Sequence, residues 1–122
     1  MNGSVLQRFC MPHVARITEK SEYQRVFSRG EKLWGRLFVC YVLVEATTEC
    51  RMGPVVSRKV GGAVIRNRVK RHVREFFRMN RHRLTPGLQL VVVARAACAA
   101  QSGHVCAREL ERMLGRHLTH DK

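Results

Sequence analysis

The stretch RKVGGAVIRNRVKRHVREFFRMNRHR, residues 58–83, has the pattern of an amphipathic helix with a strongly basic outer face. Its apolar residues recur at the spacing of one helical face: Ile65, Val69, Val73, Phe76 and Phe77. From residue 66 onward, eight Lys or Arg side chains stand against a single acid, Glu75. Like charges at this spacing repel one another. We therefore interpret the basic face as a surface for a polyanion, and the alternative is an ordinary solvated helix face.

The expected bounds of this helix follow from glycine, proline and capping residues. Gly61 and Gly62 let the chain turn tightly, and Asn67 is a plausible cap. We therefore expect the helix to begin near Asn67, which leaves Arg66 in the preceding loop rather than in the apolar arc. The Thr-Pro-Gly sequence at residues 85–87 should end it.

Two more helices are expected, one on each side of the strands. Residues 18–30 predict a short helix that Thr18 or Ser21 can cap and that Gly30 ends. Its apolar stripe, which by pattern alone is core packing, is Tyr23, Val26 and Phe27. Ser102 can cap a last helix whose apolar face is Cys106, Leu110, Met113, Leu114 and Leu118. The pattern leaves residues 96–100 open between loop and helix.

The strand signals are runs of β-branched and aromatic residues. Residues 33–45 predict one strand preceded by a possible short edge strand at Leu33–Trp34, and residues 52–57 predict a second strand, so we expect these two runs to form a hairpin. Pro54 favours an edge or bulged position. Residues 88–94, the most apolar run, predict a buried central strand.

Length and charge limit the kind of protein. A chain of 122 residues is one domain, and 45% hydrophobic residues indicate a globular chain. We expect residues 1–13 to be a flexible extension and residues 14–122 to be the domain; Met11 is a candidate natural start. A net charge of +14 points to nucleic acid first and to an anionic membrane surface second. No apolar run approaches the length of a membrane-spanning helix.

No catalytic or metal-binding pattern can be recognised in the sequence. The nine acids are scattered, and no nucleophile–base pair or phosphate-binding loop is recognisable. The spacing of the five cysteines suits neither a disulfide framework nor a zinc site, so we expect reduced thiols in a cytosolic chain: Cys10, Cys40, Cys50, Cys98 and Cys106. The pairs His104/Cys106 and His117/His120 lack further ligands at suitable spacing. We expect no catalytic residue and no metal ligand in this protein.

Residues 51–78 resemble the signature of the bacterial ribonuclease P protein subunit. The residues that carry the resemblance are Arg51-Met-Gly, then Ser57-Arg-Lys, then Ala63-Val-Ile-Arg-Asn-Arg-Val-Lys-Arg, and they occur in the order of the family pattern. The similarity extends over about residues 16–117. It implies an α+β fold, an α-β-β-β-α-β-α sandwich like the second domain of ribosomal protein S5, with a left-handed βαβ crossover where general chirality rules favour a right-handed one.

The resemblance also implies a function, partners and a location. Proteins of this family bind a catalytic RNA and the 5′ leader of precursor tRNA, and they assist endonucleolytic removal of the leader. The RNA carries the active site with Mg²⁺, so the protein is a non-catalytic subunit of a ribonucleoprotein. We expect one protein per RNA, a cytoplasmic location, no cofactor bound by the protein alone and no membrane partner.

The family's binding residues carry over by position. The basic motif, which would contact RNA, corresponds to Arg58, Lys59, Arg66, Asn67, Arg68, Lys70, Arg71, Arg74 and Arg78. The cleft aromatics, which would contact the leader, correspond to Tyr23, Phe27 and Tyr41. Tyr23 stands where Phe is usual. Gln89 takes a position that is often Asp, which puts any role of that carboxylate in doubt. The residues before Met11 have no family counterpart.

Two other functions compete with this expectation. The same charge and fold type suit a structural RNA binder such as a ribosomal protein. A nuclease that acts without RNA is the third alternative, although no catalytic constellation supports it.

Overall fold

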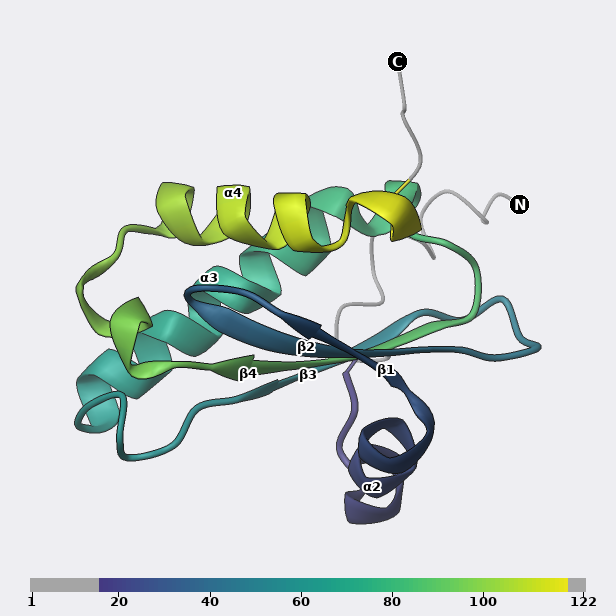
Figure 1. The fold of residues 1–122 in the computed structure, drawn as a ribbon, viewed down its shortest axis with the longest axis horizontal. Coiled ribbons are helices and arrows are strands. Elements are labelled where there is room, and N and C mark those ends of the chain that lie inside the picture. Colours follow the sequence, from purple (N-terminus) through teal and green to yellow (C-terminus); the bar gives the residue numbers. More distant parts are fainter. Residues whose placement is uncertain (1–15, 119–122) are drawn as a thin grey trace, which may run out of the picture.

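A four-stranded sheet with the order β1-β2-β4-β3 lies at the centre of the fold (Figure 1). The computed structural model of the chain describes residues 16–118. Its strands are β1 (Glu31–Trp34), β2 (Phe38–Val44), β3 (Arg51–Val55) and β4 (Leu88–Ala94). Strand β2 is antiparallel to β1 and to β4, whereas β3 is parallel to β4. The prediction that residues 88–94 form a buried inner strand is confirmed.

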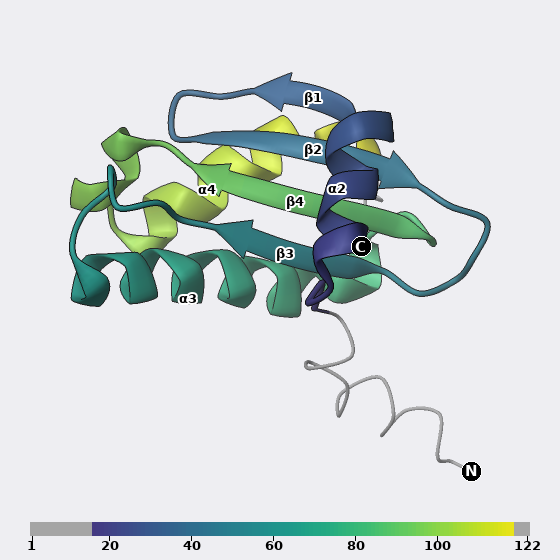
Figure 2. The same cartoon turned by 90° about the horizontal axis from the view of Figure 1, so that it is seen from below.

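Helices cover both faces of this sheet. The helices α3 (Ala63–Asn80) and α4 (Gly103–Met113) lie on one face, and α2 (Lys20–Arg29) crosses part of the other (Figures 1 and 2). Short 3-10 helices are Arg81–Arg83, Ala96–Ala100 and Gly115–His117. The element order is therefore the expected α-β-β-β-α-β-α sandwich, and the structure makes residues 96–100 a 3-10 helix.

The connection from β3 through α3 to β4 is left-handed. Figure 2 shows the parallel strands β3 and β4 side by side, with α3 on the far side of the sheet from the viewer. In Figure 2 both strands point to the left and β4 lies above β3, so turning the picture until the strands point up puts β4 to the right of β3. With the helix behind the sheet, this arrangement is a left-handed connection, opposite to the general preference. The crossover expected from the resemblance is confirmed.

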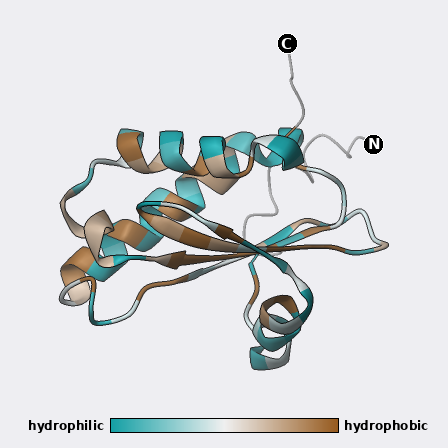
Figure 3. Ribbon diagram, viewed as in Figure 1, coloured by the Kyte–Doolittle hydropathy of each residue, from teal (hydrophilic) through white to brown (hydrophobic). Residues whose placement is uncertain are grey.

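Each face of the sheet has its own apolar cluster. Strand β4 sends Leu90 and Val92 toward α3 and α4, and it sends Val91 toward α2. The larger cluster contains most of the fully buried side chains, and the smaller one has three: Ile17, Val26 and Val91. Figure 3 shows how apolar residues concentrate along the strands.

The start of α3 differs from the expected start at Asn67. The helix begins at Ala63 with Gly62 as its N-cap, and the Arg66 N–H donates to the Gly62 carbonyl at 2.9 Å. Arg66 is therefore inside the helix, where its side chain is half-buried at the edge of the apolar arc. A long arginine stem can lie along apolar surface while the guanidinium reaches water, which removes the conflict that favoured a later start.

The predicted hairpin between residues 33–45 and 52–57 is also wrong. Strand β4 lies between β2 and β3 and pairs with both, and the hairpin of the sheet joins β1 to β2. The most apolar strand gains most from neighbours on both sides. Pro54 lacks a backbone N–H, which suits the edge position that β3 occupies.

Most helix ends lie where the sequence predicts them. Gly30 ends α2 as expected, and the Ser102 hydroxyl accepts the Val105 N–H at 3.2 Å as the expected cap of α4. The N-cap of α2 is Glu19, neither Thr18 nor Ser21, because Glu19 and Glu22 form a reciprocal capping box. The predicted extension, residues 1–13, lies outside the described residues.

Candidate nucleic-acid interface

Helix α3 is fixed by its apolar side and presents its basic side outward. Val69, Val73, Phe76 and Phe77 are buried against the sheet, and Ile65 packs partly against the same cluster. The side chains of the motif on the helix are exposed or half-buried: Arg66, Asn67, Arg68, Lys70, Arg71, Arg74 and Arg78. The amphipathic pattern of the sequence is thus realised with the two faces in the expected places.

Two motif arginines have partners within the fold. Arg78 forms an ion pair with Glu75 one turn earlier, on the exposed side of the helix. Arg68 donates through its guanidinium to the carbonyl of Ala99 in the 3-10 helix that precedes α4. Arg68 therefore also supports the position of residues 96–100, a role that the sequence does not reveal.

The other cations of the motif have no acidic partner within residues 16–118. No carboxylate of this part of the chain lies at ion-pair distance from the following side chains: Arg58, Lys59, Arg66, Lys70, Arg71 and Arg74. A cation without a neighbouring carboxylate can bind a phosphate without first breaking an ion pair. The helix therefore offers a group of cations that are available to an anionic ligand.

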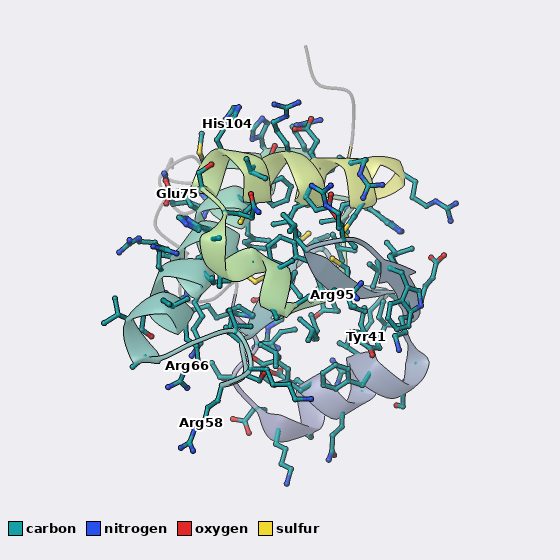
Figure 4. The ribbon with its side chains drawn as sticks, turned by 60° about the vertical axis from the view of Figure 1, so that its left-hand side comes forward. Tyr41, Arg58, Arg66, Glu75, Arg95 and His104 are labelled. Atoms are coloured by element: carbon teal, nitrogen blue, oxygen red, sulfur yellow. The ribbon has the colours of Figure 1, made fainter. Side chains whose placement is uncertain are left out.

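A tight turn brings Arg58 and Lys59 to the start of α3. The Val60 N–H donates to the Ser57 carbonyl at 3.1 Å, and the buried Val60 side chain anchors the turn in the larger cluster. Arg58 and Lys59 are exposed at its tip. Figure 4 shows Arg58 on the same side of the molecule as Arg66, so the turn extends the basic surface of the helix.

The three predicted cleft aromatics lie together on the other face of the sheet. Tyr23 and Phe27 are one turn apart on α2, with ring centroids 6.5 Å apart and the rings stacked. Phe27 meets Tyr41 of β2 edge-to-face at 4.7 Å. Phe27 is 39% exposed, so the row of rings is open to solvent between α2 and the sheet. Figure 4 shows Tyr41 beside α2, away from Arg58 and Arg66.

Two ion pairs hold α2 over the sheet. Arg51 of β3 pairs with Glu22, and the Arg25 Nε lies 2.8 Å from a carboxylate oxygen of Glu45. Burial alone would raise the pKa of Glu22, but a backbone hydrogen bond from Glu19 and the nearby Arg51 guanidinium outweigh burial and lower it. These contacts fix the aromatic row relative to the strands.

Positive charges from two other segments of the chain act on the Tyr23 hydroxyl. Burial raises the pKa of the Tyr23 hydroxyl, and the positive charges of Arg16 and Arg74 oppose that rise. Arg74 belongs to α3, and Arg16 runs alongside β3, where the Ile17 N–H donates to the Met52 carbonyl at 3.0 Å. Positive charge from α3 and from the segment beside β3 thus acts on the first ring of the aromatic row. Sequence reasoning missed Arg16, which lies outside the basic motif.

Sequence reasoning also missed Lys32 and Trp34 of β1. The Lys32 Nζ lies 4.1 Å from the centre of the Trp34 ring and 5.5 Å from that of Tyr41. The alternation of these two residues with Leu33, which packs into the larger cluster, is the signal that could have placed them on the face of Tyr41.

Gln89 has a structural role at the position where the resemblance expects Asp. Its side chain is buried, and its amide donates to the carbonyls of Glu49 at 3.1 Å and of Gly87 at 3.3 Å. These two bonds tie the loop before β3 to the start of β4. A carboxylate could not donate them, which explains why an amide suits this position.

The described part of the chain has no cluster of metal ligands. Within residues 16–118, no group of three or more His, Cys, Asp or Glu could hold a metal ion, and no helix has the length and apolarity to cross a membrane. The thiols of Cys40, Cys98 and Cys106 are buried and that of Cys50 is half-buried, and none of the four forms a disulfide. Burial raises the pKa of Cys40 to about 12. Cys10 and His120 lie outside the described residues.

Comparisons with known proteins agree on one family. The family model for ribonuclease P matches residues 11–118. The ribonuclease P protein component of Desulfovibrio desulfuricans is 38% identical over 120 residues, covering 93% of this chain and 92% of the relative. That of Exiguobacterium sibiricum is 38% identical over 102 residues, covering 83% of this chain and 88% of the relative.

Solved structures show the same fold. The RNase P protein of Staphylococcus aureus superposes with a TM-score of 0.78 at 29% identity, covering 84% of this chain and 94% of that one. The RNase P protein of Thermotoga maritima superposes with a TM-score of 0.75 at 30% identity, covering 83% of this chain and 96% of that one. The residues that the family model matches, 11–118, include α3 and the strands that flank it.

Proposed function

Because the chain belongs to the ribonuclease P protein family, we propose that it binds the catalytic RNA of that ribonuclease and the 5′ leader of precursor tRNA. In this role it assists the removal of the leader, which gives the mature 5′ end. The observation that carries the proposal is that this domain presents both α3 cations with no acidic partner within residues 16–118 and the stacked rings of Tyr23, Phe27 and Tyr41. Together these two groups form the proposed RNA-binding surface.

The two halves of this surface suit two parts of an RNA ligand. Guanidinium groups bind phosphate oxygens bidentately and read no sequence. We assign the α3 cations and the turn at residues 58–60 to folded RNA. Aromatic faces stack single-stranded bases at roughly 1–3 kcal/mol per base, also with little sequence preference. We assign the row Tyr23, Phe27 and Tyr41 to the leader, which such a row can hold whatever its sequence.

In this proposal the RNA subunit supplies the catalytic groups. The RNA would hold Mg²⁺, which would supply the activation of water and the stabilisation of the leaving oxygen in phosphodiester hydrolysis. The protein contributes affinity: its cations neutralise phosphates, and its aromatic row positions the leader beside the cleavage site. One protein then binds one RNA in the cytoplasm as a ribonucleoprotein.

Reconstitution tests the proposal directly. The purified protein is mixed with a bacterial ribonuclease P RNA at low Mg²⁺, and cleavage of precursor tRNA is followed with and without protein. We expect the protein to raise the cleavage rate, because its cations replace part of the charge screening that Mg²⁺ provides. Failure to raise the rate with a cognate RNA would contradict the proposal.

The same preparation separates the two competing functions. Protein freed of all RNA should show no turnover of precursor tRNA, and persistent turnover would instead indicate a nuclease that acts alone. Sedimentation of the protein with ribosomal particles, but not with ribonuclease P RNA, would favour a ribosomal role.

A further inference from the structure

Trp34 is the only tryptophan of the chain, and its side chain is 66% exposed at the end of β1. Leu33, its neighbour in the strand, packs into the larger cluster, so Trp34 points to the opposite face, the one that α2 partly covers. The strand register places Trp34 opposite Val39 and Lys32 opposite Tyr41. Trp34 and Tyr41 therefore share one face of the sheet.

Lys32 joins Trp34 to the aromatic row. Its ammonium group lies over the Trp34 ring at 4.1 Å and near the Tyr41 ring at 5.5 Å. The Tyr41 ring in turn meets Phe27, and Phe27 meets Tyr23. A continuous series of rings and one cation thus runs across the sheet from β3 to β1, along the direction in which α2 crosses the strands (Figure 2).

The charges around Trp34 suit a phosphate backbone. Arg36 follows Trp34 by two residues and is exposed, and the exposed Arg95 donates to the Gly35 carbonyl at 2.8 Å. Lys32 therefore holds its charge over the exposed indole, and Arg36 and Arg95 add two cations at the turn that follows Trp34. A cation–π contact at an exposed site is weak, and a base stacked on the same ring adds more to binding.

We propose that Trp34 and Lys32 form a further nucleotide-binding position, which continues the aromatic row and takes a base of single-stranded RNA together with its phosphate. The inference rests on the proposed function, because the ligand is the same leader. It adds a segment of leader beyond the part that contacts Tyr23, Phe27 and Tyr41. The protein thus distinguishes longer leaders from shorter ones.

Trp34 itself provides the first readout. The protein is assembled with ribonuclease P RNA and titrated with precursor tRNAs whose leaders lengthen one nucleotide at a time. Since every tryptophan signal comes from Trp34, base stacking there should quench the emission only once the leader is long enough to reach β1. Emission that stays unchanged for every leader length would overturn the proposal.

Substitutions provide the second readout. Trp34→Ala should weaken binding of long-leader precursor by about 5-fold or more, while binding of short-leader precursor stays unchanged. Trp34→Phe should keep most of the affinity, since a smaller ring still stacks. Lys32→Ala should lower the affinity for long leaders and reduce its salt dependence. Val44→Ala, which truncates another exposed apolar side chain of the sheet, serves as the matched control and should bind every leader like the wild type.

The comparison with Phe27→Ala separates this inference from the proposed function. If Phe27→Ala weakens leader binding and Trp34→Ala does not, the further position is wrong and the proposed function stands. If neither variant affects leader binding and the protein does not assist cleavage, both fail. A concentration-dependent dimer that Trp34→Ala abolishes without any change in RNA binding would assign Trp34 to self-association and overturn the proposal.

Discussion

Gly53 leaves on the sheet the space that the Tyr23 ring occupies. A Cβ at position 53 would lie 2.6 Å from the Tyr23 hydroxyl oxygen and 2.7 Å from two ring carbons. We therefore expect Gly53→Ala to push Tyr23 out of the aromatic row. The expected result is a several-fold smaller preference for precursor tRNA over mature tRNA. Overpacking should also lower the free energy of unfolding by about 1–3 kcal/mol. Binding of the two RNAs by the reconstituted complex measures it.

Gly115→Ala is the matched control for this substitution. No heavy atom lies within 4 Å of a Cβ built at Gly115, so the added methyl group should change neither binding nor stability appreciably. Unchanged discrimination between precursor and mature tRNA in Gly53→Ala would show that the position of Tyr23 does not matter for the leader.

Lys70 is the clearest test of the basic face. It has no acidic partner within residues 16–118, whereas Arg68 also holds the Ala99 carbonyl and Arg78 is paired with Glu75. Lys70→Ala should weaken binding of the catalytic RNA, and the slope of log K against log salt should fall by about 0.7–0.9 for the lost phosphate contact. Titrations at several salt concentrations measure both quantities.

Arg108→Ala removes the same charge from the exposed surface of α4 and is the control for Lys70→Ala. Its salt slope should match that of the wild type. An equal reduction of the slope in both variants would mean that net charge, and not the face of α3, determines RNA binding. Arg68→Ala should weaken RNA binding too, but it also removes a hydrogen bond of the fold.

Among the elements, α4 fixes the turn between β1 and β2 through Glu109. The carboxylate accepts the Arg36 N–H at 2.8 Å and the Leu37 N–H at 3.4 Å, and it pairs with Arg112 at 3.1 Å. Burial alone would raise the pKa of Glu109, but these hydrogen bonds outweigh burial and lower it below 4.5. The folded state therefore favours the ionised carboxylate.

Glu109→Gln should lower the free energy of unfolding at neutral pH by about 1–3 kcal/mol, since an uncharged amide replaces a carboxylate that accepts several hydrogen bonds. In the wild type the contribution of Glu109 is complete above pH 4.5 and is lost as the pH falls through the lowered pKa of the fold. Urea unfolding at neutral and at acidic pH should show a smaller acid loss in the variant. An identical acid loss in both proteins would contradict this.

Elements with a strong hydrophobic repeat could be predicted from the sequence, but the elements that pack or pair beside them could not. The apolar face of α3 follows from spacing alone, because Val69, Val73, Phe76 and Phe77 repeat at helical intervals. The start at Ala63 depends on how the arginine stem at position 66 lies along the surface, which spacing does not encode. The position of β4 between β2 and β3 depends on pairing between residues far apart in the chain. The prediction of a hairpin between consecutive strands was therefore wrong.

The candidate site shows the same limit. The motif and the cleft aromatics follow from the family resemblance, and the structure brings Tyr23, Phe27 and Tyr41 together. The contribution of Trp34 needs the register of β1 on β2, and that of Arg16 needs its position beside β3. Both depend on contacts between separate elements.

At the scale of the whole molecule, histidine protonation should destabilise the fold. Burial lowers the pKa of His72, and the adjacent charges of Arg68 and Arg71 lower it further. The pKa of His117 is lowered as well, mainly by burial. The unfolded chain therefore binds more protons just below pH 6.5, and the free energy of unfolding falls as the pH drops through that value. Melting temperatures between about pH 5 and 8 measure this loss.

His72→Gln should flatten this pH dependence, because the variant has no imidazole to protonate beside two arginines. His104→Gln, which removes an exposed imidazole at the start of α4, is the control and should retain the slope of the wild type. A slope that stays the same in His72→Gln would assign the acid sensitivity to other groups.

The two separate clusters on β4 make the protein easy to retarget. Substitutions on the α2 face of the sheet alter the smaller cluster or the solvent-facing rings, while the larger cluster beneath α3 and α4 keeps its own packing. Under the proposed function, substitutions of the solvent-facing rings would change which nucleotides the protein favours at little cost in stability. The same separation would let an engineer graft new nucleotide preferences onto this chain by changing one side of its sheet.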